Sequence, residues 1–134
     1  MKIFDCFMYF DEDIILEVRL NTLNDKVDYF VIVESKFTHK GDERNLKFDY
    51  NKFPKFKDKI IYLVYENEPS KIESVKENDT DYDKSTKYII NAILRENGQR
   101  NFIAKGLVKA TDDDLILVSD VDEIPNIEEI NLKD

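Results

Sequence analysis

A run of four apolar residues that turns abruptly acidic constrains the fold of this chain more than any other stretch. Leu115–Val118 has the pattern of a strand buried on both faces, which is typical of a parallel sheet. Asp120 and Asp122 follow at once, and Pro125 then bars further ladder hydrogen bonds. The acids are therefore expected at the carboxyl end of a strand, the edge of an open α/β sheet where ligands bind.

The spacing of the two acids suggests a metal site. Asp120 and Asp122 are two residues apart, so in extended geometry their side chains share a face. Their carboxylate oxygens suit a hard divalent cation such as Mg²⁺ or Mn²⁺, which would bridge to a diphosphate. A solvated acidic turn explains the same residues equally well, because acids at strand ends are common. From these residues alone, both interpretations stay open.

Other apolar runs predict strands that alternate with helices. Residues 3–10 and 29–33 read as strands, with a helix over residues 12–23 between them and no hairpin signal. Strand, helix and strand in this order imply a right-handed parallel crossover. Residues 60–64 and 115–118 supply a third and a fourth strand. We therefore predict an α/β, Rossmann-type domain with a mainly parallel sheet, in the strand order 3-2-1-4, flanked by helices.

The helices are expected to cover the sheet with apolar stripes. In the first helix, Leu16, Leu20 and Leu23 share one stripe, whereas Arg19 is expected to point elsewhere. A second, long helix is predicted from about residue 84. Gly98 is expected to kink it or divide it in two, because glycine within a helix costs about 1 kcal/mol relative to alanine. The polar stretch over residues 66–86 is expected to be a mobile excursion beside the site.

The charge of the chain excludes some partners. Its 134 residues carry a formal net charge of −9, so neither a nucleic-acid backbone nor an anionic membrane is expected as the main partner. The single cysteine, Cys6, cannot form an internal disulfide and is expected to be a buried structural thiol. No apolar run approaches the roughly 20 residues that span a bilayer, so the chain as given is expected to be soluble and cytoplasmic.

Several motifs together resemble a known family. An Asp-x-Asp at the end of a buried strand is the donor-site signature of GT-A glycosyltransferases, and residues 117–125 resemble the form found in glycosyltransferase family 17. Further matches lie in residues 4–10, 16–20, 27–35 and 95–101, in the order of the family. The ordered set covers nearly the whole chain, which makes the resemblance more specific than one acidic pair.

The resemblance implies a function for residues 1–134 as a single GT-A-like domain that binds a nucleotide sugar. The implied donor is UDP-N-acetylglucosamine, and the implied acceptor is a glycan. In such enzymes the acid pair holds Mn²⁺ or Mg²⁺ against the donor diphosphate. Asp120 and Asp122 are therefore the implied metal ligands, and Asp120 is also an implied donor contact.

Three further residues are expected at the donor. Glu34 ends the second strand at the same edge, where an acid can accept hydrogen bonds from a base or a ribose, although a capping role explains it nearly as well. The family pattern of Arg-Glu followed by Gln-Arg-Asn implies Arg95 and Arg100, and arginine suits phosphate through its planar fork of donors. A solvated helix face is the ordinary alternative for both. His39, the only histidine, is expected in a loop rather than in catalysis.

The resembled family continues for about as long again after the metal motif. We therefore expect residues 1–134 to be the N-terminal part of a longer catalytic domain, with the catalytic base and the acceptor site beyond Asp134. No catalytic residue is identified in the sequence itself. Apolar sheet surface left uncovered would be closed either by a missing C-terminal half or by self-association as a homo-oligomer.

Two other functions remain as alternatives. A phosphatase of the haloacid dehalogenase type also carries Asp-x-Asp after an apolar strand, with the first Asp as the nucleophile. Here an extra acid, Glu123, follows the pair, and the motif of such phosphatases usually opens the fold. The other alternative is a non-catalytic binding scaffold that keeps the GT-A fold.

Overall fold

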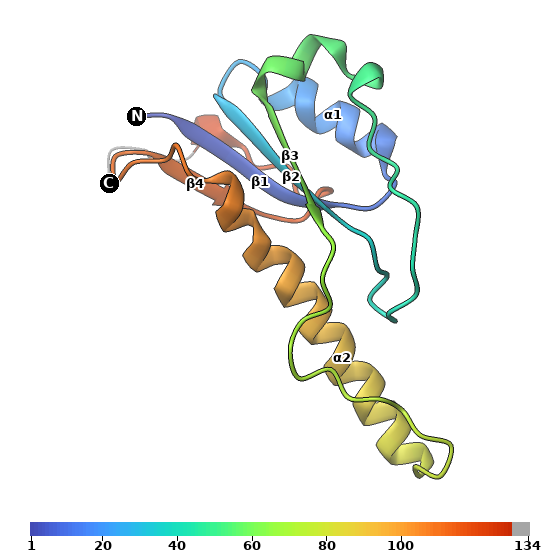
Figure 1. Cartoon of the computed structure of the whole chain (residues 1–134). Coiled ribbons are helices and arrows are strands. Elements are labelled where there is room, and N and C mark those ends of the chain that lie inside the picture. The colour runs from blue at the N-terminus through green and yellow to red at the C-terminus, as the bar shows by residue number, and fades with distance from the viewer. Residues whose placement is uncertain (130–134) are drawn as a thin grey trace.

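All four strands of the sheet run parallel, in the order β3-β2-β1-β4. The computed structural model describes residues 1–129 (Figure 1). This arrangement confirms the predicted α/β, Rossmann-like fold and its strand order. The strands are β1 Ile3–Tyr9, β2 Tyr29–Ser35, β3 Ile60–Tyr65 and β4 Leu115–Val118.

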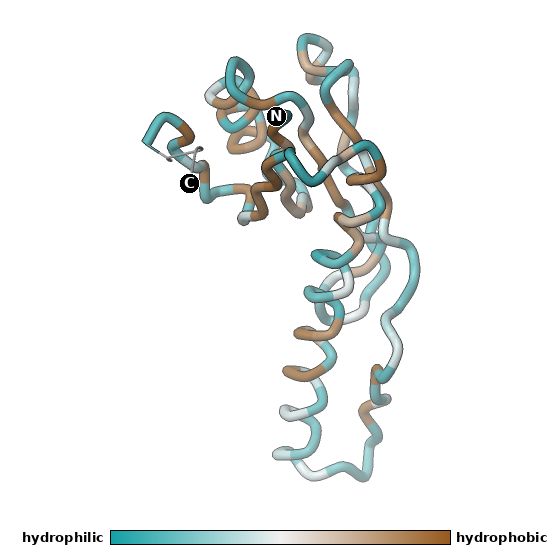
Figure 2. Tube along the Cα trace, turned by 90° about the vertical axis from the view of Figure 1, so that its left-hand side faces the viewer, coloured by the Kyte–Doolittle hydropathy of each residue, from teal (hydrophilic) through white to brown (hydrophobic). Residues whose placement is uncertain are grey.

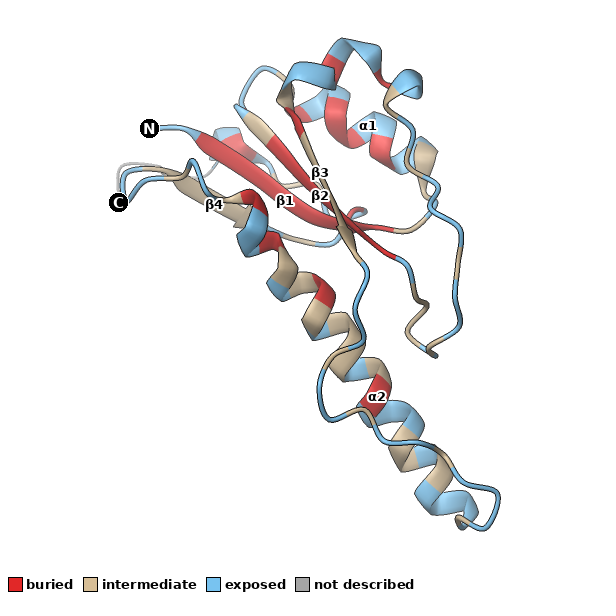
Figure 3. Ribbon diagram, in the orientation of Figure 1, coloured by how far each residue is buried: buried red, intermediate tan, exposed pale blue. Residues whose placement is uncertain are grey.

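Two α-helices and several short 3-10 helices connect the strands. The α-helices are α1 Asp13–Leu23 and α2 Asp81–Asn101, and the 3-10 helices are η1 Tyr50–Lys52, η2 Pro54–Lys59, η3 Phe102–Gly106 and η4 Ile127–Glu129. β1 and β2 are buried along almost their whole length (Figure 3). These two central strands carry the fully apolar runs, as expected for a sheet that is covered on both faces.

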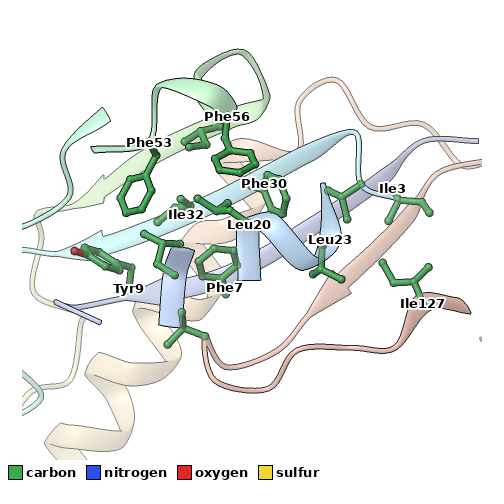
Figure 4. Packing of buried hydrophobic residues seen from close by; sticks show 14 residues of the cluster. Ile3, Phe7, Tyr9, Leu20, Leu23, Phe30, Ile32, Phe53, Phe56 and Ile127 are labelled. Atoms are coloured by element: carbon green, nitrogen blue, oxygen red, sulfur yellow. The ribbon is translucent and has the colours of Figure 1, made fainter. Parts of the chain in front are cut away.

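The first face of the sheet packs against α1, η1 and η2 (Figure 4). The predicted stripe of Leu16, Leu20 and Leu23 is buried there. The prediction that Arg19 points elsewhere is wrong, because Arg19 lies on the same stripe and is fully buried. It occupies the position three residues after Leu16, which falls on the same side of a helix. The rest of this core is apolar and includes Ile3, Phe7, Tyr9, Phe30, Ile32, Phe53, Phe56, Val121 and Ile127.

The second face of the sheet packs against η3. Phe4, Cys6, Val31, Val33 and Ile103 form its buried core. Cys6 is therefore a buried free thiol, as predicted. Burial raises the pKa of this thiol to about 12, and the nearby charge of Asp5 adds to the rise. Cys6 is protonated at neutral pH and is packed as a small apolar side chain.

The helix α2 projects away from the sheet, with the segment over residues 66–80 running beside it (Figures 1 and 2). Asn91 joins the two, because its side chain donates to the Glu73 carbonyl (2.7 Å) and accepts from the Glu73 amide (3.0 Å). Hydrophobic stretches on the projecting helix stay uncovered, and Ile89 is 62% exposed. Among residues 1–129, no helix combines the length and the apolar character that crossing a membrane requires.

Gly98 does not divide α2, which corrects the sequence prediction. The helix continues unbroken from Asp81 to Asn101. A Cβ at Gly98 would lie 2.4 Å from the Tyr65 hydroxyl oxygen, so glycine allows the end of β3 to approach the helix closely. The helix begins where Thr80 caps it by accepting a hydrogen bond from the Asp83 amide (3.1 Å).

Candidate functional site

The strand order reverses beside β1. The chain steps from β1 to β2 to β3 on one side, whereas β4 pairs with β1 on the other side. In open α/β sheets, ligands bind in the crevice at this switch point, outside the carboxyl ends of the strands. A cleft of about 410 Å³ opens there, and Met8, Asp120, Val121 and Asp122 belong to its lining. The fold therefore brings the two predicted metal ligands to one cleft.

Other elements close the cleft. Phe10 follows β1, Glu12 immediately precedes α1, Ile15 lies in the first turn of α1, His39 comes from the loop after β2, and Glu96 comes from α2. These segments are distant in sequence but meet at the carboxyl edge of the parallel sheet. The lining mixes apolar side chains with a few polar groups, which is usual for a ligand site.

The charge of the cleft has one sign. Four of its lining residues are acids, namely Glu12, Glu96, Asp120 and Asp122, and in the described part of the chain no Lys or Arg lines it. An anionic ligand would be repelled by these carboxylates unless a cation accompanied it. The cleft therefore favours a cation, or an anion that carries one.

The two aspartates belong to a turn at the end of β4, residues 119–123, which we call the acidic loop. The Asp120 amide donates to Glu123 Oε1 (3.1 Å), and the Glu123 amide donates to the Asp120 carbonyl (2.9 Å). Val121 is buried in the core, whereas Asp120 and Asp122 are exposed. A buried residue between two acids turns both neighbours outward, so the loop presents them at the cleft.

Arg19 holds this loop from beneath. Its Nη1 donates to the backbone carbonyls of Asp120 (2.7 Å), Val121 (3.3 Å) and Glu123 (3.1 Å). Its Nη2 donates to Ser119 Oγ (2.6 Å). One side chain of α1 therefore fixes four consecutive or nearly consecutive residues that lie about a hundred positions later in the chain.

Asp5 of β1 pairs with Arg19 through both of its oxygens. Arg19 Nε lies 2.8 Å from Oδ2 and Nη2 lies 2.6 Å from Oδ1, and both side chains are fully buried. The sequence held a signal for this pair that we did not use. Asp5 is an acid in the middle of a buried apolar strand, and a buried charge requires a partner of opposite charge. Arg19 was the arginine on the stripe that faces the sheet.

Glu34 lies under the loop that follows β2 and does not line the cleft. Its carboxylate forms an ion pair with Arg44 Nη1 (2.9 Å) and accepts hydrogen bonds from Tyr62 Oη (2.6 Å), the Lys47 amide (2.7 Å) and the Phe48 amide (3.1 Å). Burial, together with the hydrogen bond to Glu34, raises the pKa of Tyr62 above its ordinary value. Glu34 thus anchors the chain around residues 44–48.

Arg44 is a second residue that the sequence analysis missed. Besides Glu34, it donates to the backbone carbonyl of Ser35 (2.6 Å) and to that of Phe10. Phe10 lines the cleft, so Arg44 ties the end of β1 at the cleft to the end of β2. No motif pointed to it, because a basic residue in a polar loop has no pattern of its own.

Neither predicted arginine of α2 lines the cleft. Arg95 donates from Nη1 to the His39 carbonyl (3.0 Å) and pairs with Glu68 (3.0 Å), so it supports the loop that brings His39 to the cleft. Arg100 pairs with Glu96 (3.0 Å), one helical turn away. Arg95 therefore contacts the backbone of the lining residue His39, and Arg100 contacts the side chain of the lining residue Glu96.

His39 is part of the cleft, with its ring edge against Phe10 (5.2 Å between ring centroids). Its Nε2 is buried and has no hydrogen-bond partner among residues 1–129. Gly41 shapes the loop, since its φ of +98° lies in the left-handed region that favours glycine. Because Nε2 is closed off from solvent, it does not itself face a ligand in the cleft.

The acid pair fits a cation that a substrate completes. Over the described residues 1–129, no group of three or more His, Cys, Asp or Glu side chains could enclose a metal ion. Mg²⁺ and similar ions are usually held by one or two carboxylates together with substrate phosphates and water, rather than by an all-protein cage. Two exposed aspartates at an open cleft match that donor set.

Comparison with known proteins identifies the family of the chain. The family model described as "Glycosyltransferase family 17" matches residues 1–134. The chain belongs to glycosyltransferase family 17. The resemblance carried by the acidic pair and the four other motifs is thereby confirmed.

Two curated relatives of this family 17 chain are similar over most of its length. The human and the rat protein named beta-1,4-mannosyl-glycoprotein 4-beta-N-acetylglucosaminyltransferase are each 30% identical to it over 115 residues. The matched region covers 83% of this chain and 19% of each relative. The chain therefore spans about a fifth of the length of these relatives. No solved structure matches it.

Proposed function

We propose that the cleft at the ends of β1 and β4 binds the complex of a divalent cation with a nucleotide sugar. In this proposal the domain supplies the donor site of a glycosyltransferase. The observation that supports it most is the cleft itself, which lies at the switch point of the sheet and is lined by four acids and, among residues 1–129, by no Lys or Arg. Such a cleft takes up a diphosphate only together with a cation.

Asp120 and Asp122 would hold the cation, Mn²⁺ or Mg²⁺, at the exposed end of the acidic loop. When bound, the cation supplies charge stabilisation to the diphosphate that departs as the glycosidic bond breaks. In this proposal the backbone of the acidic loop is held in place, so that both aspartates stay at the rim of the cleft. This geometry follows from the buried Val121 between them and from the carbonyl contacts of Arg19.

The other lining residues would orient the donor. The carboxylates of Glu12 and Glu96 can accept hydrogen bonds from the hydroxyl groups of the sugar or the ribose. Apolar surface from Phe10 and Ile15 excludes water from part of the cleft. Direct donor contacts by Glu34, Arg95 and Arg100 remain predictions, because these three residues lie behind the lining.

The sugar and the acceptor are proposed from the relatives. Both are named for the transfer of N-acetylglucosamine to a mannosyl-glycoprotein, which favours UDP-N-acetylglucosamine as the donor and a glycan as the acceptor. Membership of family 17 favours glycosyl transfer over the phosphatase alternative. A phosphatase would hydrolyse p-nitrophenyl phosphate in Mg²⁺ with Asp120 as the nucleophile, and we expect no such turnover.

Calorimetric titration of UDP-N-acetylglucosamine in the presence of Mn²⁺ tests the proposal. We expect binding by the wild type and at least a tenfold weaker affinity for Asp120→Asn and for Asp122→Asn, because each substitution removes an anionic ligand. Asp112→Asn is the matched control, since Asp112 is exposed in the turn before β4 and away from the cleft. Absent binding by the wild type, or equal affinity for all three variants, would contradict the proposed function.

A further inference from the structure

We propose that Arg19 is the positioning residue of the acidic loop, and that its buried pair with Asp5 holds residues 119–123 in the metal-ready conformation before a ligand arrives. The statement about the loop stands on the geometry alone, whereas its consequence for metal affinity rests on the proposed function. Arg19 would thus control the site without touching the substrate.

The contacts of Arg19 use its full hydrogen-bonding capacity. Nε and one N–H of Nη2 go to Asp5, the other N–H of Nη2 goes to Ser119, and Nη1 serves three loop carbonyls. A guanidinium has five N–H donors, so this set leaves none for a substrate. The side chain is also fully buried. Its effect on a ligand must therefore pass through the loop.

Asp5 and Phe7 fix the guanidinium in place. Asp5 forms a bidentate contact with Nε and Nη2 of the guanidinium, and the centroid of the Phe7 ring lies 4.5 Å from Arg19 Cζ. Both residues belong to β1, one of the two central strands of the sheet and the one that pairs with β4. The loop is therefore held to an inner strand of the sheet through a bidentate ion pair, which has a defined orientation as well as a charge.

Holding the backbone matters because the loop must bring like charges together. Asp120 and Asp122 repel one another when no cation is present, and a free loop would separate them. Arg19 binds backbone carbonyls of the loop and does not contact the carboxylate of Asp120 or Asp122. Both carboxylates therefore keep their charge for a cation in the cleft that the two residues line. Groups that orient metal ligands typically change metal affinity by about 10- to 100-fold when they are removed.

The decisive variant replaces both members of the pair, as Asp5→Leu with Arg19→Met. Replacing a buried ion pair by apolar residues of similar volume is often neutral for stability, whereas removal of one partner leaves a buried charge unpaired. We expect the double variant to keep a thermal midpoint close to that of the wild type. We expect its metal-free amides at Asp120 and Glu123 to exchange with deuterium at least tenfold faster, and its Mn²⁺ affinity to fall by about 10- to 100-fold.

Lys59→Met is the matched control. Lys59 also clamps backbone carbonyls, those of Asn24 (2.6 Å) and Val27 (3.0 Å), but it contacts the chain before the start of β2, away from the acidic loop. We expect this variant to lower the thermal midpoint while loop exchange and Mn²⁺ affinity stay as in the wild type. The control would thereby separate an effect on the stability of the whole domain from an effect on the order of the acidic loop.

The outcomes distinguish this proposal from the proposed function. If the folded double variant keeps the exchange rates of the wild-type loop, Arg19 is not the positioning residue. If the wild type binds no Mn²⁺ even in the presence of UDP, the proposed function fails, and the exchange rates still decide about Arg19. Should the double variant not fold, Arg19→Lys replaces it, since lysine keeps the charge but offers only three donors from one atom. Wild-type loop exchange in Arg19→Lys would then overturn the proposal.

Discussion

Replacing Glu34 by glutamine tests whether this acid is an anchor of the scaffold. The substitution keeps the size of the side chain but removes its charge and turns one acceptor into a donor. In the structure Glu34 is fully buried, accepts three hydrogen bonds and forms an ion pair with Arg44. Each oxygen of Glu34 contacts one backbone amide and one side-chain donor. The NH₂ group of glutamine cannot accept a hydrogen bond, so the backbone amide that faces it loses its partner.

The expected loss follows from the buried charge that remains. Removing one partner of a buried ion pair costs about 3–5 kcal/mol. Arg44 keeps its contacts to the carbonyls of Ser35 and Phe10 in this variant. We therefore expect Glu34→Gln to lower the free energy of unfolding by about 3 kcal/mol, near the lower end of that range. That is a large share of the roughly 5–15 kcal/mol by which a domain is stable. Urea unfolding followed by circular dichroism measures it, and the absence of tryptophan makes this signal preferable to fluorescence.

Glu66→Gln is the matched control for this measurement. Glu66 pairs with Lys36 at 3.8 Å, and both side chains are largely exposed. Exposed pairs contribute about 0–1 kcal/mol, so this variant should unfold almost like the wild type. If Glu34→Gln is no less stable than Glu66→Gln, the anchoring argument is refuted. A loss of UDP affinity at unchanged stability would instead restore the predicted donor contact of Glu34.

Two further outcomes follow from the packing of the sheet. Because burial raises the pKa of Cys6 from 9.0 to about 12, the folded state holds a proton that the unfolded state loses between these values, so the free energy of unfolding should fall as pH rises through this window. A thiol reagent at pH 8 should label Cys6 only in the unfolded protein, and equally fast labelling of the native protein would show that the thiol is not buried. Gly106→Ala should lower the free energy of unfolding, measured in urea, by about 1–3 kcal/mol, because its Cβ would lie 2.6 Å from Val31 Cγ1. Unchanged stability would show that η3 and β2 move apart at little cost.

Much of the fold could be predicted because its strands are fully apolar and its first helix has a regular stripe. These patterns report burial directly, and the strand-helix-strand order leaves few topologies. The position of Asp120 and Asp122 at one cleft followed from the same reasoning, since the carboxyl ends of parallel strands share an edge. The break at Gly98 was predicted wrongly, because the cost of glycine in a helix says nothing about the neighbour, Tyr65, that requires it.

The supporting contacts of the site could not be predicted in the same way. Arg19 acts on residues a hundred positions away, and helix periodicity alone treats a charged side chain as exposed. Only the combination with Asp5, a charge inside an apolar strand, points to a buried pair. Arg44 bonds mainly to backbone carbonyls, and such contacts leave no pattern in the sequence. His39 reached the cleft through a loop whose path depends on Gly41 and Arg95.

The affinity for UDP with and without Mn²⁺ tests the central claim most directly. A cleft lined by four acids should bind the diphosphate poorly in EDTA and about tenfold more tightly, or more, at saturating Mn²⁺, and UDP should raise the affinity for Mn²⁺ by the same factor. The gain should vanish when Asp120→Asn and Asp122→Asn are combined. Equal UDP affinity with Mn²⁺ and with EDTA in the wild type, or a gain that survives in the double variant, would contradict the account.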